Sequence, residues 1–130
     1  MKYVRDLCIN DTIMLKNRPV KILELLHSHS NSNNNYLILI RGTDMFNNDI
    51  IEDTYRLNWT VQKYKPIIEN YIFMYVDKNN YIHVHSHDNE RIKIKLKILD
   101  DILILQNISN YVDIQLIKFN DEYRLLNIIR

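Results

Sequence analysis

The chain has 130 residues and a formal net charge of +1. This total charge does not indicate a strongly basic nucleic-acid-binding protein, but it is compatible with a local basic patch on the surface. Its hydrophobic fraction of 46% and charged fraction of 25% are typical of a soluble globular protein with one compact domain or two very small ones. A single cysteine, Cys8, excludes an internal disulfide and fits a reducing compartment.

Two further features bear on where the protein works. No apolar run approaches the roughly 20 residues of a membrane helix, and the N-terminus lacks the apolar core of a signal peptide, so we expect a cytoplasmic protein with no membrane partner. The sequence has no alanine and one glycine, against many Ile, Asn, Lys and Tyr residues. That bias indicates an AT-rich genome, such as that of a large DNA virus or a protist, and a viral protein would act in the host cytoplasm.

The first half of the chain is predicted to form short β-strands. No window shows a sustained helical period, and apolar runs rich in β-branched residues alternate with Asn- and Asp-rich turns. Residues 11–17 and 18–26 predict two strands joined at Lys16 to Arg18. Residues 36–42 predict a third strand with both faces buried. Its Gly42 indicates a positive φ or a close backbone approach. Two short strands are predicted to flank a turn at 47–48.

The second half also reads as β-structure. Pro66, within "QKYKPII", is the best candidate boundary between domains. After it we expect a hairpin (69–76 and 81–87), an alternating strand (90–96), a segment that is either a short helix or a strand (98–108), and two final strands (111–119 and 122–130). We therefore predict an all-β protein with two small barrels, residues 1–66 and 67–130, the second of the oligonucleotide-binding (OB) type.

Several motifs carry a resemblance to a known family. Leu15-Lys16-Asn17-Arg18-Pro19 and then Lys21-Ile22-Leu23-Glu24 follow the pattern Leu-Lys-Gly-Arg-Pro and Lys-Ile-Val-Glu of translation factor 5A, the hypusine-containing relative of bacterial elongation factor P. Residues 42–53 resemble the Gly-x-Asp-x-Phe segment and Glu-Asp pair of that family, and residues 69–84 are similar to the first hairpin of its second domain. The resemblance implies an N-terminal SH3-like barrel followed by a C-terminal OB-fold barrel.

The resemblance also identifies "HSHSNSNNNY", the polar stretch between the second and third strands. In the family, a lysine at the tip of this loop is converted to hypusine, which reaches the peptidyl-transferase centre beside the peptidyl-tRNA. Read without gaps, Ser32 takes that position, and no lysine occurs from Glu24 to Asp49, so we expect a tip without hypusine. The implied partner is the ribosome, through its rRNA and tRNA. The candidate contact residues are His27, Ser28, His29, Ser30, Asn31, Ser32, Asn33, Asn34 and Asn35. The alternative is a solvated loop whose Asn content follows codon bias.

Four basic residues are predicted to lie in strands or turns that adjoin the tip loop: Lys16, Arg18, Lys21 and Arg41. The resemblance implies that they face rRNA and tRNA phosphates, which would give a salt-sensitive affinity without sequence specificity. The alternative is an ordinary charged surface in which acidic residues pair with these cations. The candidates for such pairing are Asp44, Glu52 and Asp53.

Two patterns in the second half suggest other sites. His83, His85 and His87 alternate, as zinc ligands on a strand can, but we favour the polar outer face of a hairpin and assign no metal. The basic residues of "RIKIKLK", residues 91–97, form a row that could follow a nucleic-acid backbone. Here we favour an edge strand kept soluble by its lysines.

No catalytic constellation or phosphate loop is present, so we expect a binding protein with no enzyme activity, cofactor or small-molecule substrate. The leading hypothesis is a ribosome-binding protein that lacks hypusine and modulates, mimics or blocks the host factor. A second is a self-assembling structural protein, since the fungal Woronin-body protein resembles translation factor 5A and also lacks hypusine. A third is a stand-alone RNA-binding module.

Overall fold

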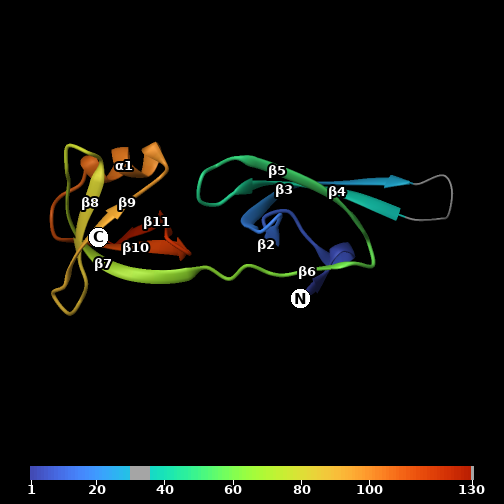
Figure 1. Ribbon diagram of the computed structural model, residues 1–130, viewed down its shortest axis with the longest axis horizontal. Helices are drawn as coiled ribbons and strands as arrows, with labels where there is room; N and C mark the ends of the chain where they lie inside the picture. The colour runs from blue at the N-terminus through green and yellow to red at the C-terminus, as the bar shows by residue number, and fades with distance from the viewer. Residues whose placement is uncertain (30–35, 130) are drawn as a thin grey trace. The chain divides into compact units, whose positions relative to one another are not determined.

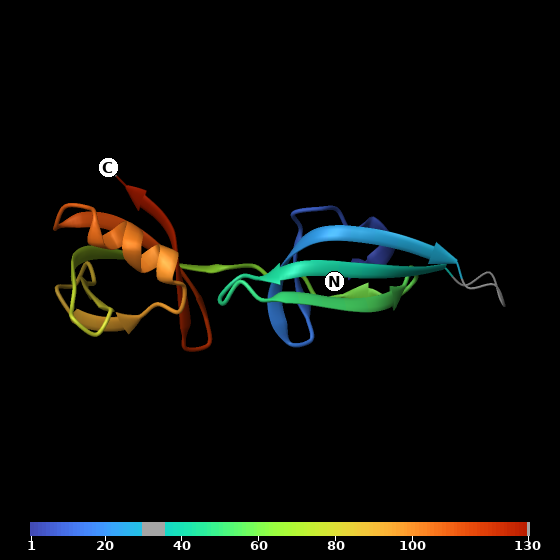
Figure 2. The same cartoon turned by 90° about the horizontal axis from the view of Figure 1, so that it is seen from above.

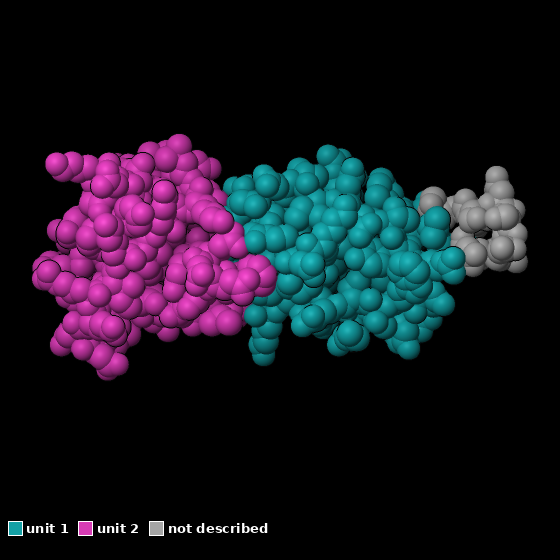
Figure 3. All heavy atoms as spheres, in the orientation of Figure 1, with its two compact units in different colours: residues 1–65 teal, residues 66–130 magenta. Residues whose placement is uncertain are grey.

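The computed structural model describes residues 1–29 and 36–129. The chain divides into two compact units, Met1–Lys65 and Pro66–Arg130 (Figure 3). Each unit has a hydrophobic core of its own. The described residues include no helix that is long and apolar enough to span a bilayer.

The first unit is a four-stranded antiparallel sheet with a short two-stranded pair (Figure 1). The sheet has the order β2-β3-β4-β5, and β1 pairs with β6. Its core is aliphatic and includes Ile13, Val20, Ile22, Ile38 and Ile40. The elements are β1 (Lys2–Tyr3), the 3-10 turn η1 (Val4–Asp6), β2 (Thr12–Leu15), β3 (Arg18–His29), β4 (Tyr36–Asp44), β5 (Ile50–Arg56) and β6 (Thr60–Val61).

The predicted turn between β2 and β3 lies at Lys16 and Asn17, with φ values of 50° and 64°. Two consecutive residues with positive φ are characteristic of the type I′ hairpin turn, whose twist matches that of the strands it joins. Leu15 and Arg18 form the last pair before the turn. The arginine therefore begins β3.

Gly42 is needed for a close approach, as predicted, but its φ is not positive. A Cβ atom at this position would lie 2.6 Å from the carbonyl oxygen of Lys21 and would overlap the side chain of Val20. The prediction that this strand is buried on both faces is wrong. Leu37 and Leu39 are only half-buried, because they lie on the face of β4 opposite to the core residues Ile38 and Ile40.

The second unit is a five-stranded antiparallel sheet in the order β11-β10-β7-β8-β9. This order, with a helix between the third and fourth strands, is that of an OB-type barrel. The core includes Phe73, Ile82, Leu105, Ile114 and Leu116. The elements are β7 (Ile67–Val76), β8 (Tyr81–His85), β9 (Arg91–Lys95), α1 (Leu99–Gln106), β10 (Val112–Phe119) and β11 (Glu122–Ile129). The ambiguous segment is thus a helix, which packs Ile102 and Leu105 into the core.

The all-β prediction is confirmed. By its bounds, β3 is the longest of the described strands of the first unit. Figure 2 shows β3, β4 and β5 side by side, in light blue, teal and green. β3 and β4 pair from Val20, opposite Asp44, to His29, opposite Tyr36, with one interruption. A bulge at Leu23 shifts the register between the Ile22–Gly42 and Glu24–Arg41 pairs. We call the part of this hairpin beyond the bulge, residues 24–29 and 36–41, the arm.

Candidate nucleic-acid interface

The arm positions the predicted tip loop. The His27–Ile38, Ser28–Leu37 and His29–Tyr36 pairs hold its strands together up to the loop, and β5 pairs alongside β4 as far as Arg56. His27, the first of the predicted contact residues, is exposed. The remaining predicted contact residues, Ser30 to Asn35, lie outside the described residues.

An aromatic and cationic cluster lies beside the outer end of the arm, where Tyr55 is opposite Ile38 and Arg56 is opposite Leu37. The rings of Tyr55 and Trp59 meet edge to face with centroids 5.9 Å apart, and the Arg56 guanidinium lies 5.8 Å from the Trp59 ring centroid. Trp59 and Arg56 are exposed. This cluster offers a stacking surface and a cation, the two groups that bind unpaired bases and phosphates. Sequence reasoning missed it, since only the β5–β6 turn brings these residues together.

Three of the four basic residues, Lys16, Arg18 and Lys21, precede the Leu23 bulge and lie away from the tip. Arg18 begins β3 and His29 ends it, so 11 residue steps separate them, which is roughly 35 Å along a strand. Lys16 lies in the β2–β3 turn, before Arg18. Lys16 and Arg18 therefore lie at the far end of a strand that adjoins the loop, and a contact of these cations with rRNA or tRNA phosphates stays a prediction.

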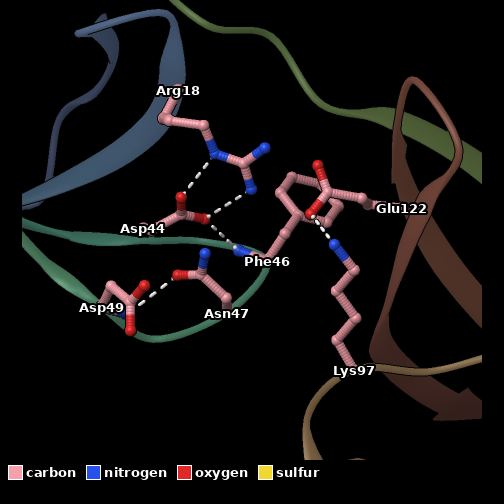
Figure 4. Close-up of polar contacts among 7 residues, drawn as sticks. All are labelled: Arg18, Asp44, Phe46, Asn47, Asp49, Lys97 and Glu122. Atoms are coloured by element: carbon pink, nitrogen blue, oxygen red, sulfur yellow. Dashed lines mark hydrogen bonds and ion pairs between the residues drawn. The ribbon is translucent and has the colours of Figure 1, made fainter.

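Arg18 is held by a buried carboxylate (Figure 4). Its Nε and Nη2 donate to Asp44 Oδ2 and Oδ1 at 2.6 and 3.2 Å, and Asp44 also accepts a hydrogen bond from the backbone N–H of Phe46 at 2.8 Å. The side chain of Asp44 is only 1% exposed. The alternative that Asp44 pairs with a basic residue is confirmed for Arg18. This pair fixes the end of β4 and the following turn, where Asn47 Oδ1 accepts a hydrogen bond from Asp49 N.

Lys21 and Arg41 lie on the outer face of the sheet and are both exposed. Lys21 is the register partner of Thr43, and Arg41 lies between Glu24 and Glu52 in the register. The guanidinium of Arg41 is 3.8 Å from the carboxylate of Glu24, an exposed pair that holds the two side chains weakly. Arg41 is thus the cation of the predicted four that belongs to the arm.

The histidines of the second unit do not form a metal-binding triplet. His83 Nε2 lies 2.8 Å from Asp77 Oδ2, and this hydrogen bond is the main cause that lowers the pKa of the Asp77 carboxyl. His87 lies beyond β8 and is exposed. Within residues 1–29 and 36–129, no three His, Cys, Asp or Glu side chains gather as metal ligands would.

The basic strand β9 is the last in the order of the five-stranded sheet, in agreement with the prediction of an edge strand. Lys97 follows this strand and its Nζ donates to Glu122 Oε1 at 2.7 Å (Figure 4). Lys97 is thus paired with a carboxylate beyond the end of β9, whereas Arg91, Lys93 and Lys95 lie on the strand itself.

The comparisons with known proteins agree on one fold. A translation initiation factor 5A family protein from Naegleria fowleri matches with a TM-score of 0.73 and 13% identity over 98% of this chain and 95% of that one. Eukaryotic translation initiation factor 5A from Methanococcus jannaschii matches with a TM-score of 0.74 and 11% identity over 98% and 92%. No family model and no curated protein sequence matches.

These matches define the class of fold. The chain has the two-domain all-β architecture of translation factor 5A, an SH3-like barrel followed by an OB-fold barrel. The fold prediction made from the sequence is therefore confirmed.

Proposed function

We propose that this chain is a translation factor 5A-like protein that binds the ribosome near the exit site and the peptidyl-tRNA. The observation that carries the proposal is the likeness in fold over 98% of the chain. The paired arm supports it, because β3 and β4 remain joined up to the two ends of the loop that contains Ser32. The proposed site of action is the cytoplasm, which is that of the host if the gene is viral.

The chemistry of the tip distinguishes this protein from a hypusine-containing factor. Hypusine is built on a lysine ε-amine, and the loop has Ser32 and neighbouring Asn residues instead. Hydroxyl and amide groups donate and accept hydrogen bonds with phosphates, ribose hydroxyls and base edges, but they carry no charge. We therefore propose that the tip occupies its site without stimulating peptide-bond formation. The protein would then modulate, mimic or block the host factor.

Affinity in this proposal comes from cations near the arm. Arg41 and Arg56 are exposed and lie on neighbouring strands of the same sheet. Each phosphate that they neutralise contributes affinity that falls with salt. The protein would act by binding alone, with no chemical step.

The test is co-sedimentation with eukaryotic ribosomes across a salt series. We expect the wild type to sediment at low salt, and Arg41→Gln with Arg56→Gln to weaken binding and reduce the slope of log affinity against log salt by about 2. Lys63→Gln with Lys65→Gln changes the net charge equally but lies at the end of the first unit, so it is the matched control. Absence of binding at low salt would overturn the proposal.

A second variant tests the tip. Ser32→Lys restores an amine for the modifying enzymes of the host. If the tip occupies the hypusine site, the modified variant should support synthesis through proline runs better than the wild type does. Full activity of the wild type in that assay would contradict a non-stimulating tip.

A specific observation favours self-assembly as a second candidate. The side chains of Leu23, Leu26 and Ile50 are exposed on strands of the same sheet. Exposed apolar side chains are a common feature of contacts between copies of a protein. Sedimentation velocity over a concentration series tests this candidate. A constant monomer value would remove it, and growth that Leu26→Ser abolishes would support it.

A further inference from the structure

The outer face of β8 and β9 in the second unit brings aromatic and basic side chains together. In the register of the sheet, Tyr75, His83 and Lys93 lie in one row across β7, β8 and β9. Tyr81 is opposite Lys95, and His85 is opposite Arg91. Because residues directly opposite one another share a face, these rows form a single surface, which we call the β8–β9 face.

A bulge creates this arrangement. Phe73 is buried opposite Val84, so Tyr75, two residues later, would normally point into the core as well. The register shifts between Phe73 and Tyr75, with Met74 as the extra residue, and this turns Tyr75 outward opposite His83. The sheet thus departs from regular pairing at the position where it presents an aromatic ring.

Tyr75 and His83 form a stacked pair. Their ring centroids are 4.4 Å apart and their planes are inclined by only 9°. Asp77 holds the His83 ring through the 2.8 Å contact to Nε2, while Tyr75 is 50% exposed. The pair therefore presents a flat, fixed aromatic surface. An unstacked nucleobase can stack on such a surface, and this interaction does not depend on which base it is.

The cations of the same face are available to a ligand. Lys93 Nζ and Lys95 Nζ lie 4.3 and 5.6 Å from the ring centroid of Tyr81. In the part of the chain that the structure describes, neither these lysines nor Arg91 forms an ion pair with a carboxylate, whereas Lys97 and Lys118 each pair with a glutamate. Asp77 contacts this face and is engaged by His83.

A shallow cavity of about 150 Å³ lies on this face. His85 contributes to its lining, and His85 Nδ1 is buried without a hydrogen-bond partner among the described residues. A buried polar atom without a partner costs free energy that a ligand hydrogen bond would recover. The other lining residues include Met74, Tyr75, His83, Arg91 and Lys93.

We infer that the β8–β9 face binds single-stranded RNA, with bases stacked on the Tyr75–His83 pair and phosphates contacted by Arg91, Lys93 and Lys95. Stacking platforms combined with unpaired cations bind single strands in OB folds generally. A duplex would not bind in this way, because its bases are already stacked on one another. The choice of RNA over DNA rests on the proposed function. The stacked aromatic pair and the cations are observed in the structure and do not depend on that proposal.

The test is fluorescence anisotropy of the full chain with a labelled uridine oligomer of about 12 nucleotides, within the roughly 4–16 nucleotides that an OB fold covers. Tyr75→Leu keeps an apolar side chain and removes the stacking surface, and we expect it to weaken binding roughly 10-fold. Lys93→Gln with Lys95→Gln should reduce the salt slope by about 1.4. Lys63→Gln with Lys65→Gln, equal in charge change but in the first unit, should leave binding unchanged.

Thermal unfolding of each variant confirms that a loss of binding is not a loss of folding. An affinity unchanged in folded Tyr75→Leu, or an equal loss in the matched control, overturns the inference. Equal affinity for a thymidine deoxyoligomer overturns the assignment to RNA. Ribosome co-sedimentation of Tyr75→Leu separates this inference from the proposed ribosome binding. A variant that sediments with ribosomes normally but no longer binds the oligomer would show that the β8–β9 face and the arm are distinct sites.

Discussion

Arg18 and Asp44 join the first residue of β3 to the last residue of β4 through two hydrogen bonds of 2.6 and 3.2 Å. The carboxylate is buried, and its charge is compensated by the guanidinium and by the Phe46 N–H. The pair therefore anchors the end of the hairpin opposite to the tip. A residue that the sequence suggested for RNA contact has a structural role in the first unit.

The first prediction concerns this pair. Arg18→Met should lower the free energy of unfolding by about 3 kcal/mol, because it leaves a buried carboxylate without its cation. Adding Asp44→Asn should recover part of the loss, because no buried charge then remains. Chemical denaturation of the two single variants and the double variant measures the coupling. Additive losses would show that the two side chains do not depend on each other.

The second prediction concerns Gly42. Gly42→Ala places a methyl group 2.6 Å from the Lys21 carbonyl oxygen, and this contact can be relieved only by a shift of the backbone. We expect a loss of about 2 kcal/mol in unfolding free energy. Thr43→Ala, on the same strand and half-buried, is the control and should cost clearly less. Equal losses would contradict a steric requirement at Gly42.

The third prediction concerns the β2–β3 turn. Lys16 has a φ of 50°, a left-handed conformation that a lysine adopts at a cost. Lys16→Asn with Asn17→Gly introduces the preferred type I′ dipeptide and should raise the unfolding free energy by about 1 kcal/mol. An unchanged denaturation midpoint would count against the turn type. The same variant removes a predicted RNA-facing cation, so its ribosome affinity can be compared directly with that of the wild type.

The fourth prediction concerns Asp101, which is 5% exposed. Burial raises the pKa of its carboxyl, although the Leu125 N–H at 3.0 Å and the nearby Arg124 partly oppose this. The folded state therefore binds a proton at higher pH than the unfolded state, whose pKa is near 3.8. Asp101 destabilises the fold at neutral pH, and this effect diminishes as the pH falls through the folded pKa.

Asp101→Asn removes this titration while keeping a side-chain oxygen for the Leu125 N–H. The stability of the wild type relative to this variant should therefore improve as the pH is lowered from 7 towards 4. Denaturation of both proteins at several pH values measures the difference. A difference that stays constant across this range would be inconsistent with a raised pKa.

The sequence was sufficient for most strands and insufficient for the helix. Alternation such as that of Ile92 and Ile94 with Lys93 and Lys95 indicates a strand directly. In α1, Leu103 and Ile104 are exposed while Ile102 and Leu105 are buried, so apolar residues occur on every side and no helical period is visible.

The candidate sites were harder to predict for a different reason. The distance of Arg18 from the tip depends on how far the β3–β4 pairing continues, and composition does not show this. The stacking of Tyr75 on His83 depends on a bulge at Met74, which shifts the face of every residue that follows. The motifs indicated which chemical groups are present, but strand register decides which of them meet.

The bulge at Leu23 has a consequence for how such an arm changes in evolution. Beyond it, Leu25 faces Ile40 and His27 faces Ile38, so both strands keep the same alternation towards the tip. Inserting one residue in each strand would exchange the faces of all residues further out, while inserting two in each would restore them. The reach of the tip is therefore expected to vary among relatives in increments of about 7 Å, rather than continuously.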